Sequence, residues 1–377
     1  MASADTLALL NAGKLTGTNH IKISAELTSF PNALYSLTDT LEILESMIGF
    51  KANQITHIPE HAIPTQNLRW LIVTDNALTH LPKSIGACKK LQKLMLAGNQ
   101  LSALPDSLAN CHTLELLRVS ANQINALPNW LLKLPKLAWL AYAGNPFADV
   151  YEAENMRKLH AVEIDWAQLS IGKVLGQGAS GITYQADWHH DGLNEAVAVK
   201  IFKSGLTSDG LPRCEMDANI LAGAHSNLVG VKGIITHHPQ HIQGLVMPLL
   251  DPNLKVLAQP PSFDSCTRDV YLDACKLSFE QAKHIANGVR SAMQHLHTQG
   301  LMHGDLYAHN ILWSDTQVVL SDLGGASFLP LQDKALAQNL MRLDIRAYRI
   351  LLEELVQNAG LTDGEAAAIR AFAPNTL

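Results

Sequence analysis

The chain has 377 residues, 47% of them hydrophobic, and a formal net charge of -6. This length exceeds what one ordinary hydrophobic core supports, so two folded domains are expected. The sequence has no excess of basic residues, which disfavours nucleic acid or an anionic membrane surface as a partner. Composition alone nominates no ligand.

Five cysteines are scattered along the sequence without a C-x-x-C pair: Cys88, Cys111, Cys214, Cys266 and Cys275. An odd and widely spaced set fits neither a disulfide framework nor a zinc site. The first twenty residues lack the apolar core of a secretory signal, and no later stretch is long and apolar enough to span a bilayer. The sequence therefore predicts a cytoplasmic protein in a reducing compartment.

An asparagine recurs every 23 residues in the first part of the chain: Asn53, Asn76, Asn99, Asn122 and Asn145. The same apolar frame surrounds each copy, and Cys88 and Cys111 share one frame position, which predicts stacked core residues and not a reactive pair. Each unit predicts a short strand whose apolar side chains need neighbouring units to bury them. The asparagine amides are expected to bond backbone groups that the turns leave unpaired.

These units resemble the leucine-rich-repeat family over roughly residues 20–150. The resemblance implies an α/β solenoid, or horseshoe, in a first domain at 1–160 with an N-terminal cap and a capping helix near 149–160. The strand side chains between the inward positions either line a concave protein-binding face or are merely solvated: Arg69, Trp70, Ile72, Thr74, Gln92, Lys93, Met95, Glu115, Leu116, Arg118, Ala138, Trp139 and Ala141. Trp70 and Trp139, expected as exposed aromatic residues, favour binding.

A glycine-rich segment begins soon after residue 164, where the 23-residue period stops. It contains Gly176, Gln177, Gly178 and Gly181. The G-x-G-x-x-G pattern alone is a weak signal, but residues 182–188 alternate as a strand does, which favours a hairpin over phosphates against a dinucleotide-binding turn. Glycine suits that role because the backbone must approach phosphate oxygens closely.

Lys200 lies at the end of the short apolar strand 197–200, and a helical stretch that carries Glu215 follows it. An ion pair between these side chains would hold the ammonium group against the α- and β-phosphates of a nucleotide. Asp217 is the rival partner, because the helix is out of register by one residue relative to the usual spacing before His225.

The pattern H-x-D-L-x-x-x-N runs from His303 to Asn310, and Asp322-Leu323-Gly324 follows a strand-like segment at 317–320. Together with the glycine loop and the strand lysine, these motifs stand in the order found in the protein-kinase family. The resemblance covers residues 165 to about 355.

This resemblance implies an α+β bilobal kinase-like domain at 161–377, with an N-lobe at about 165–250 and a shortened C-lobe at about 251–377. Asp344 resembles the aspartate that leads a buried lower-lobe helix and caps the catalytic loop. Residues 251–276 predict an irregular loop and a short helix beside an ATP cleft. With few residues after Asp344, several lower-lobe helices are expected to be missing, so the domain is either a compact kinase or one stabilised by its solenoid.

The resemblance also implies the roles of individual residues, with ATP and Mg²⁺ as cofactors. The predicted catalytic residues are Asp305 as proton acceptor, Lys200, Glu215 and His309, and the predicted metal ligands are Asn310 and Asp322. The predicted ATP-binding residues are Gly176, Gln177, Gly178, Gly181, Thr183, Ala198, Lys200, Met247 and Leu249. His303 is predicted to be a core residue and not a base.

Several residues depart from the family pattern. Gly304 replaces the arginine that grips an activation-loop phosphate, so that switch cannot operate. Tyr307 stands where Ser/Thr kinases commonly place a lysine, and His309 stands where tyrosine kinases carry an arginine. Ser327 is the sole hydroxyl residue between Asp322 and the predicted helix, and no A-P-E motif follows.

Three functions remain open on this basis. The first is a protein kinase whose acceptor residue is Ser or Thr in preference to Tyr, and whose repeats bind a protein substrate or partner on the concave face. The second is a pseudokinase scaffold that binds nucleotide, and the third is phosphorylation of a small molecule. A metal site at His237, His238 and His241 is disfavoured against a solvated loop. The sequence gives no oligomeric state.

Overall fold

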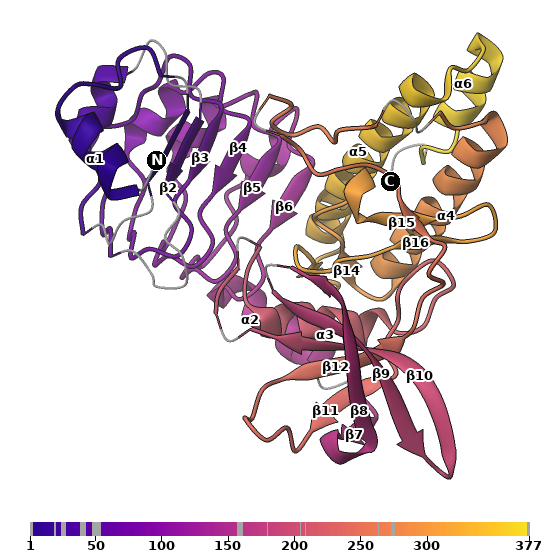
Figure 1. Ribbon diagram of the computed structural model, residues 1–377. Helices are drawn as coiled ribbons and strands as arrows, with labels where there is room; N and C mark the ends of the chain where they lie inside the picture. The colour runs from indigo at the N-terminus through magenta and orange to yellow at the C-terminus, as the bar shows by residue number, and fades with distance from the viewer. Residues whose placement is uncertain are drawn as a thin grey trace. The chain divides into compact units, whose positions relative to one another are not determined.

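A computed structural model of the protein is shown in Figure 1. It describes residues 3–18, 20–23, 28–37, 43–46, 54–156, 161–178, 180–203, 205–207, 209–262, 264–272 and 276–374. The chain forms two compact units. The repeat unit comprises residues 1–150, 206–210 and 261–268, and the bilobal unit comprises 151–205, 211–260 and 269–377. Asn53, the first of the recurring asparagines, lies outside the described residues.

The repeat unit is a parallel sheet of six strands in chain order. The strands are β1 (His20–Ile23), β2 (Ile43–Ser46), β3 (Trp70–Ile72), β4 (Lys93–Met95), β5 (Leu116–Arg118) and β6 (Trp139–Ala141). Helix α1 (Ser3–Asn11) precedes the sheet, and short 3₁₀ turns return the chain between strands: η1 (Asn32–Leu37), η2 (Lys83–Ala87), η3 (Asp106–Asn110) and η4 (Leu131–Lys133). This architecture is the predicted α/β solenoid.

The repeated asparagines form a buried ladder inside the turns. Asn99 Oδ1 accepts a hydrogen bond from Leu78 N at 3.0 Å, and its Nδ2 donates to Val73 O at 3.0 Å. Asn122 and Asn145 repeat this geometry one and two turns further on. The prediction for these amides is confirmed, and the physical reason is that the tight turns leave backbone groups without strand partners.

The last repeat continues into helix α2 (Pro146–Met156), as predicted for a capping helix. Phe147 N donates to Ile124 O at 3.2 Å, and the Phe147 ring lies 5.4 Å from that of Tyr142. The first helical turn of α2 therefore closes the apolar core of the last repeat. Cys88 and Cys111 are fully buried and free, and burial raises the pKa of their thiols to about 12 and about 11, so they are core residues as predicted.

The expectation that Trp70 and Trp139 are exposed is wrong. Their exposed fractions are 9% and 1%, because other side chains of the repeat unit cover them. Lys93 Nζ lies 4.0 Å from the centre of the Trp70 ring, and the Arg268 guanidinium lies 5.4 Å from that of Trp139. The sheet face that carries them is therefore packed and not solvated.

The bilobal unit begins with a six-stranded sheet in the order β7-β11-β12-β10-β9-β8. Its strands are β7 (Glu163–Asp165), β8 (Leu169–Gln177), β9 (Gly181–His190), β10 (Leu193–Phe202), β11 (Gly233–Thr236) and β12 (Gly244–Pro248), with η5 (Trp166–Gln168) and helix α3 (Pro212–Ala222) between strands. The glycine-rich segment thus joins two antiparallel strands, as the hairpin prediction required.

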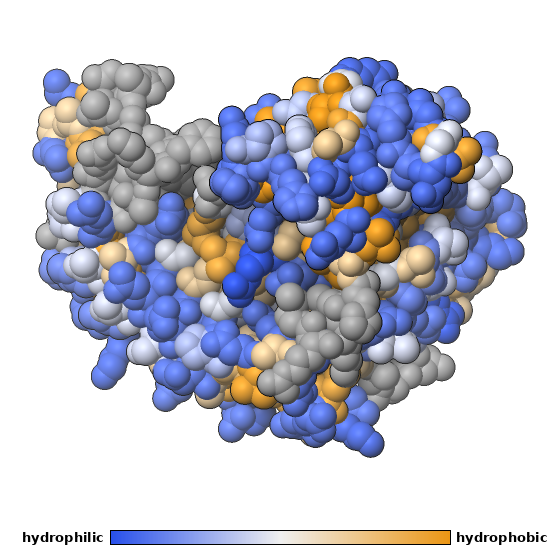
Figure 2. Space-filling view, turned by 90° about the horizontal axis from the view of Figure 1, so that it is seen from below, coloured by the Kyte–Doolittle hydropathy of each residue, from blue (hydrophilic) through white to orange (hydrophobic). Residues whose placement is uncertain are grey.

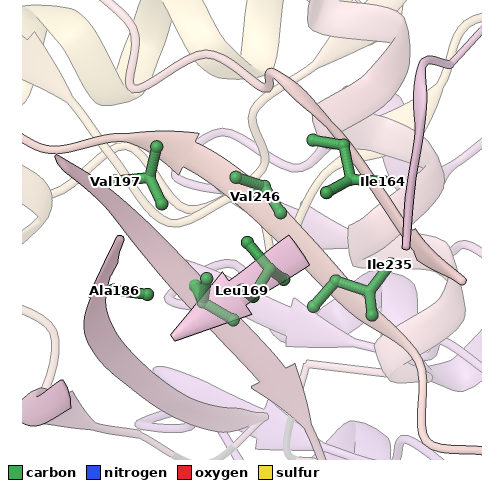
Figure 3. Close-up of a cluster of buried hydrophobic side chains, with 7 residues drawn as sticks. Ile164, Leu169, Ala186, Val197, Ile235 and Val246 are labelled. Carbon is green, nitrogen blue, oxygen red and sulfur yellow. The ribbon is translucent and has the colours of Figure 1, made fainter. Parts of the chain in front are cut away.

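Alternation along β10 sorts its side chains between two apolar clusters. Val197 and Val199 face the cluster drawn in Figure 3, together with Ile164, Leu169 and Val246. On the other face, Ala198 packs with Phe202, Leu245 and Met247. Because strand side chains alternate, Lys200 shares the face of Ala198.

The rest of the bilobal unit is mainly helical. Its helices are α4 (Phe279–Thr298), α5 (Lys334–Ala359) and α6 (Asp363–Arg370), and its short strands are β13 (Lys255–Val256), β14 (Leu301–Met302), β15 (Ile311–Trp313), β16 (Val318–Leu320) and β17 (Ser327–Phe328), with η6 (Ala308–Asn310) before β15. Helix α5 begins well before Asp344, so the prediction that Asp344 leads this helix is wrong.

The described part of 251–276 contains strand β13, which pairs with β15, and no helix, so the short helix predicted there is also wrong. In the described chain, none of the helices is both long enough and apolar enough to cross a bilayer. The face drawn in Figure 2 is mainly hydrophilic, with apolar residues in small separate patches, as is common on protein surfaces.

Candidate active site

Lys200 of β10 and Glu215 of α3 form an ion pair through Nζ and Oε1. Glu215 is 3% exposed and the Lys200 side chain is 18% exposed, so the pair is largely shielded from water. Burial raises the pKa of the Glu215 carboxyl, which the Lys200 charge opposes. The rival Asp217 lies instead 3.9 Å from Arg213 Nε, one helical turn away, so Glu215 is the partner of the lysine.

The loop between β14 and η6 is anchored by Asp344, which is fully buried in α5. Its Oδ2 accepts from His303 N at 2.8 Å and its Oδ1 from Gly304 N at 3.0 Å. His297 Nε2 of α4 donates to the same carboxylate at 2.9 Å. His303 is itself fully buried, and its Nε2 donates to Ser321 O at 3.2 Å. These contacts give His303 a structural role.

Hydrogen bonds connect Asp305 to Asn310 and Asn310 to Ser321, the residue before Asp322. Asn310 Nδ2 donates to Asp305 O at 2.9 Å and to Asp305 Oδ2 at 3.1 Å. Asn310 O accepts from Ser321 N at 2.8 Å, and Asp322 follows in a left-handed conformation with φ 59°. Asp322 Oδ1 accepts from Gly324 N at 3.0 Å. The Asn310 amide and the Asp322 carboxylate are therefore positioned by backbone groups, and the Asp305 carboxylate is positioned by Asn310.

His309 is fixed by a residue that the sequence analysis missed, Asp269. Asp269 Oδ1 lies 2.7 Å from His309 Nδ1, and Asp269 Oδ2 accepts from His309 N at 3.0 Å. Burial lowers the pKa of His309, but the bond to Asp269 and the charges of Asp269, Asp305 and Asp322 outweigh it and raise that pKa. A single aspartate in an irregular loop carries no sequence signal that would have identified it.

The charge of Asp322 also raises the pKa of Glu215, which places the Lys200–Glu215 pair within electrostatic reach of Asp322. Asp322 and Asp305 act in the same way on His309. The charge of Asp322 therefore acts on both Glu215 and His309, although these residues come from distant parts of the chain. Sequence spacing alone could order these motifs but could not show their convergence.

A cavity of about 530 Å³ lies between β8, β9, β10, β12 and the start of β15. Five of the predicted nucleotide-binding residues line it: Gly176, Thr183, Ala198, Met247 and Leu249. Val229, Leu254 and Leu312 also line it and were not predicted. Leu312 could have been found from the sequence, because it follows Asn310 at an alternate strand position. Gln177, Gly178, Gly181 and Lys200 do not line this cavity.

Two glycines of the hairpin differ in what they permit. A Cβ atom on Gly181 would lie 2.5 Å from Ile201 O, so this glycine allows β9 and β10 to approach each other. A Cβ on Gly178 would meet nothing within 4 Å, and Gly178 N donates to Gly181 O at 3.0 Å. Gly181 is thus explained by strand packing, whereas Gly178 borders open space.

The loop histidines that were considered as metal ligands have another explanation. His237 Nδ1 lies 2.8 Å from Asp165 Oδ2, and the His238 ring packs edge-on against Trp166, 4.3 Å between centres. Among the residues that the structure describes, no group of three or more His, Cys, Asp or Glu side chains is arranged to hold a metal ion.

Two models of known protein families match parts of the chain. Residues 169–354 match the family model of the protein tyrosine and serine/threonine kinases, and residues 89–147 match a leucine-rich-repeat model. The bilobal unit is thus a protein kinase domain. The chain thus carries a leucine-rich-repeat region before that domain, which is consistent with the predicted fusion of the two.

Three relatives illustrate the range of the similarity. The chain is 27% identical to fibroblast growth factor receptor 1 of Pleurodeles waltl over 42% of its length, 30% identical to the megakaryocyte-associated tyrosine-protein kinase of Rattus norvegicus over 43%, and 26% identical to a cyclin-dependent kinase 4 homolog of Caenorhabditis elegans over 40%. The matches span 20%, 31% and 36% of those proteins. The similarity is therefore to a domain and not to a whole relative.

Proposed function

We propose that the bilobal unit is an active protein kinase that transfers the γ-phosphoryl group of ATP to a protein hydroxyl group. One observation carries the proposal: Lys200 is paired with the buried Glu215, in a fold that also holds the Asn310 amide on Asp305. Phosphoryl transfer depends chiefly on positioning and on charge stabilisation, and these groups supply both.

The cavity supports nucleotide binding. Its walls at Ala198, Met247 and Leu312 are apolar, as a nucleobase requires, and Gly176 lines its edge. A Cβ on Gly176 or Gly178 would meet nothing within 4 Å, so the backbone of the hairpin leaves room for phosphate groups. We propose that Lys200, oriented by Glu215, binds the phosphates next to the base.

The oxygen atoms near Asp305 suit a divalent cation. Asn310 uses its amide nitrogen to bond Asp305, which makes its side-chain oxygen the ligand atom, and the Asp322 carboxylate supplies a second ligand. Hard oxygen donors of this kind are preferred by Mg²⁺. When bound, Mg²⁺ would neutralise negative charge on the phosphates.

We propose that Asp305 accepts the proton of the acceptor hydroxyl. Its backbone oxygen and its carboxylate oxygen Oδ2 both accept hydrogen bonds from Asn310 Nδ2, which fixes the orientation of the carboxylate. His309 lies on the same loop as Asp305 and is held by Asp269. We propose that it completes the catalytic group. A preference for Ser or Thr over Tyr stays a prediction, and phosphoamino-acid analysis of the products decides it.

Leucine-rich repeats suggest a protein-interaction module. We propose that the sheet face carrying Glu115 and Arg118 is the surface that binds protein segments, because both charged side chains are buried there. We also propose a cytoplasmic location. Cys88, Cys111 and Cys266 are free and buried, which supports a reducing compartment.

The test is phosphate transfer from labelled ATP with Mg²⁺ to generic protein acceptors, with the full chain and with Asp305→Asn. Loss of the proton acceptor is expected to lower kcat by about 10²–10⁴-fold. Asp363→Asn, which makes the same charge change in α6, is the matched control and should retain full activity. Equal transfer by wild type and Asp305→Asn would refute the role of Asp305.

A nucleotide-binding scaffold is the second candidate, favoured by the absence of an arginine at Gly304 and by the burial of Ser327, which is 0% exposed in β17. The two candidates differ in one outcome. A scaffold binds ATP to the wild-type chain with no transfer to any acceptor, whereas a kinase shows transfer that Asp305→Asn abolishes.

A further inference from the structure

Two short segments from the second half of the sequence belong to the repeat unit, at 206–210 and 261–268. Both contact the sheet face, defined here as the side of β3–β6 that carries Lys93, Glu115, Arg118 and Trp139. This is the face on which the sequence predicts an external partner. The described residues of the two segments place their own side chains on it.

The first segment fits the sheet face by charge and by shape. Asp209 Oδ1 accepts from Arg118 Nε at 2.8 Å, and Arg118 is 1% exposed. Leu206 packs on Gly98, where a Cβ would lie 1.9 Å from Leu206 Cδ2. A Cβ on Gly210 would lie 2.8 Å from Ser120 Cβ. The buried guanidinium therefore has its counter-charge from this segment, and the two surfaces meet without room to spare.

The second segment makes a complementary set of contacts. Glu115, 4% exposed, accepts hydrogen bonds from Thr267 Oγ1 and from Arg268 NH1, the latter at 2.9 Å. Cys266 is fully buried at the centre of the segment. Arg69 NH2 donates to Asp264 O at 3.4 Å. One acidic and one basic side chain of the sheet face are thus matched by a basic and an acidic side chain from the two segments.

Each docked segment leads directly into a part of the proposed active site. Gly210 is followed by Leu211, the N-cap of α3, and α3 carries Glu215. Arg268 is followed by Asp269, which bonds both the backbone and the ring of His309. Leu211 alone therefore separates the first segment from α3. Asp269 follows the second segment directly.

We infer that the repeat unit is an internal regulator of the kinase domain: its sheet face holds segments 206–210 and 261–268 and thereby positions α3 and Asp269. Asp269 is in this scheme a positioning residue that acts through His309. The docking of the two segments on the sheet face does not depend on whether the chain transfers phosphate. The effect of docking on phosphate transfer rests on the proposed kinase function.

The experiment uses the full chain with Asp209→Ala and Arg268→Ala. Each change removes the opposite charge that pairs with a buried charged side chain of the sheet face, which destabilises the contact. Asp264→Ala is the matched control, because it removes an exposed carboxylate from a docked segment whose sheet contact is made by backbone oxygen. All three variants keep every residue of the proposed catalytic group.

Hydrogen exchange measures docking. We expect amides of 205–222 in Asp209→Ala, and of 264–272 in Arg268→Ala, to exchange on the order of tenfold faster or more, with Asp264→Ala unchanged. Unchanged exchange in both variants would overturn the docking. A kinetic assay measures regulation, with an expected fall of about tenfold in kcat/KM for ATP.

The outcomes separate the two claims. Faster exchange with unaltered kinetics would overturn the regulatory role and leave docking in place. A wild-type chain that transfers no phosphate would sink the proposed function, and the exchange of the docked segments would still decide whether the sheet face holds them. Faster exchange together with lower kcat/KM supports the inference in full.

Discussion

Replacement of Asp344 by alanine should uncouple the catalytic loop from α5. The Asp344 carboxylate accepts from two backbone groups, His303 N and Gly304 N, and from His297 Nε2. Asp344 is 0% exposed, so water cannot replace the lost acceptor without entering the core. Each buried N–H left without a partner costs about 1–3 kcal/mol, which gives about 2–6 kcal/mol for the two backbone groups.

Urea unfolding measures this loss in the free energy of unfolding. Hydrogen exchange of peptides from α4 and α5 is the readout that locates it. Glu353→Ala is the control, because Glu353 is an exposed carboxylate on the same helix that pairs with Arg370 at the surface. That change should cost less than about 1 kcal/mol. A loss for Asp344→Ala as small as that of the control would refute the anchoring role, and Asp344→Asn, which keeps one acceptor, should fall between them.

The pH dependence provides a second check on Asp344. Burial raises its pKa, but the His297 bond and charge and the backbone bonds outweigh burial and hold the pKa below the usual range. A carboxyl whose folded pKa is depressed stabilises the fold above its unfolded pKa of about 4, and this stability is lost as the pH falls through the folded pKa. The difference between wild type and Asp344→Ala should therefore shrink in acid.

Two further predictions concern neighbouring elements. Burial raises the pKa of Asp217 to about 6, so the protonated carboxyl favours the fold below the unfolded pKa and this stability is lost as the pH rises through 6. Asp217→Asn should therefore stabilise the kinase domain by up to about 3 kcal/mol at pH 7.5 and by little near pH 4. Urea unfolding at the two pH values measures the difference. Gly181→Ala should destabilise the hairpin, because the added Cβ meets Ile201 O. Gly178→Ala should leave the stability unchanged and weaken the affinity for ATP, measured by calorimetry. An unaltered affinity would contradict phosphate binding at Gly178.

The solenoid could be predicted in detail because its signal is repeated. Each asparagine of the ladder occupies the same environment, so Asn99 and Asn122 provide independent evidence for one local structure. The sheet face was predicted less well. Trp139 alternates with inward leucines as a solvated residue would, and the Arg268 guanidinium that lies over its ring comes from 261–268, far along the chain. Periodicity describes the strand and not what covers it.

The kinase domain shows the same division between local and distant causes. The order of its motifs predicts which residues form the site, with Glu215 as the partner of Lys200 and Asp217 as its rival. The choice against Asp217 depended on the rotation of α3, which one residue of register decides. Asp269 could not be found at all, because its role depends on the fold bringing an irregular loop to His309.

Buried charges on the sheet face connect these observations. A solenoid gains nothing for its own stability by burying Arg118 and Glu115, because taking a charged side chain out of water costs several kcal/mol unless a partner compensates for it. The apolar frame around each asparagine already stabilises the stack, and alanine or serine would serve at these strand positions. Charged residues at such positions therefore require partners, and the structure supplies them from the two segments that precede α3 and Asp269. Selection for that requirement is easier to explain if holding those segments matters to the kinase domain than if the face served the solenoid alone.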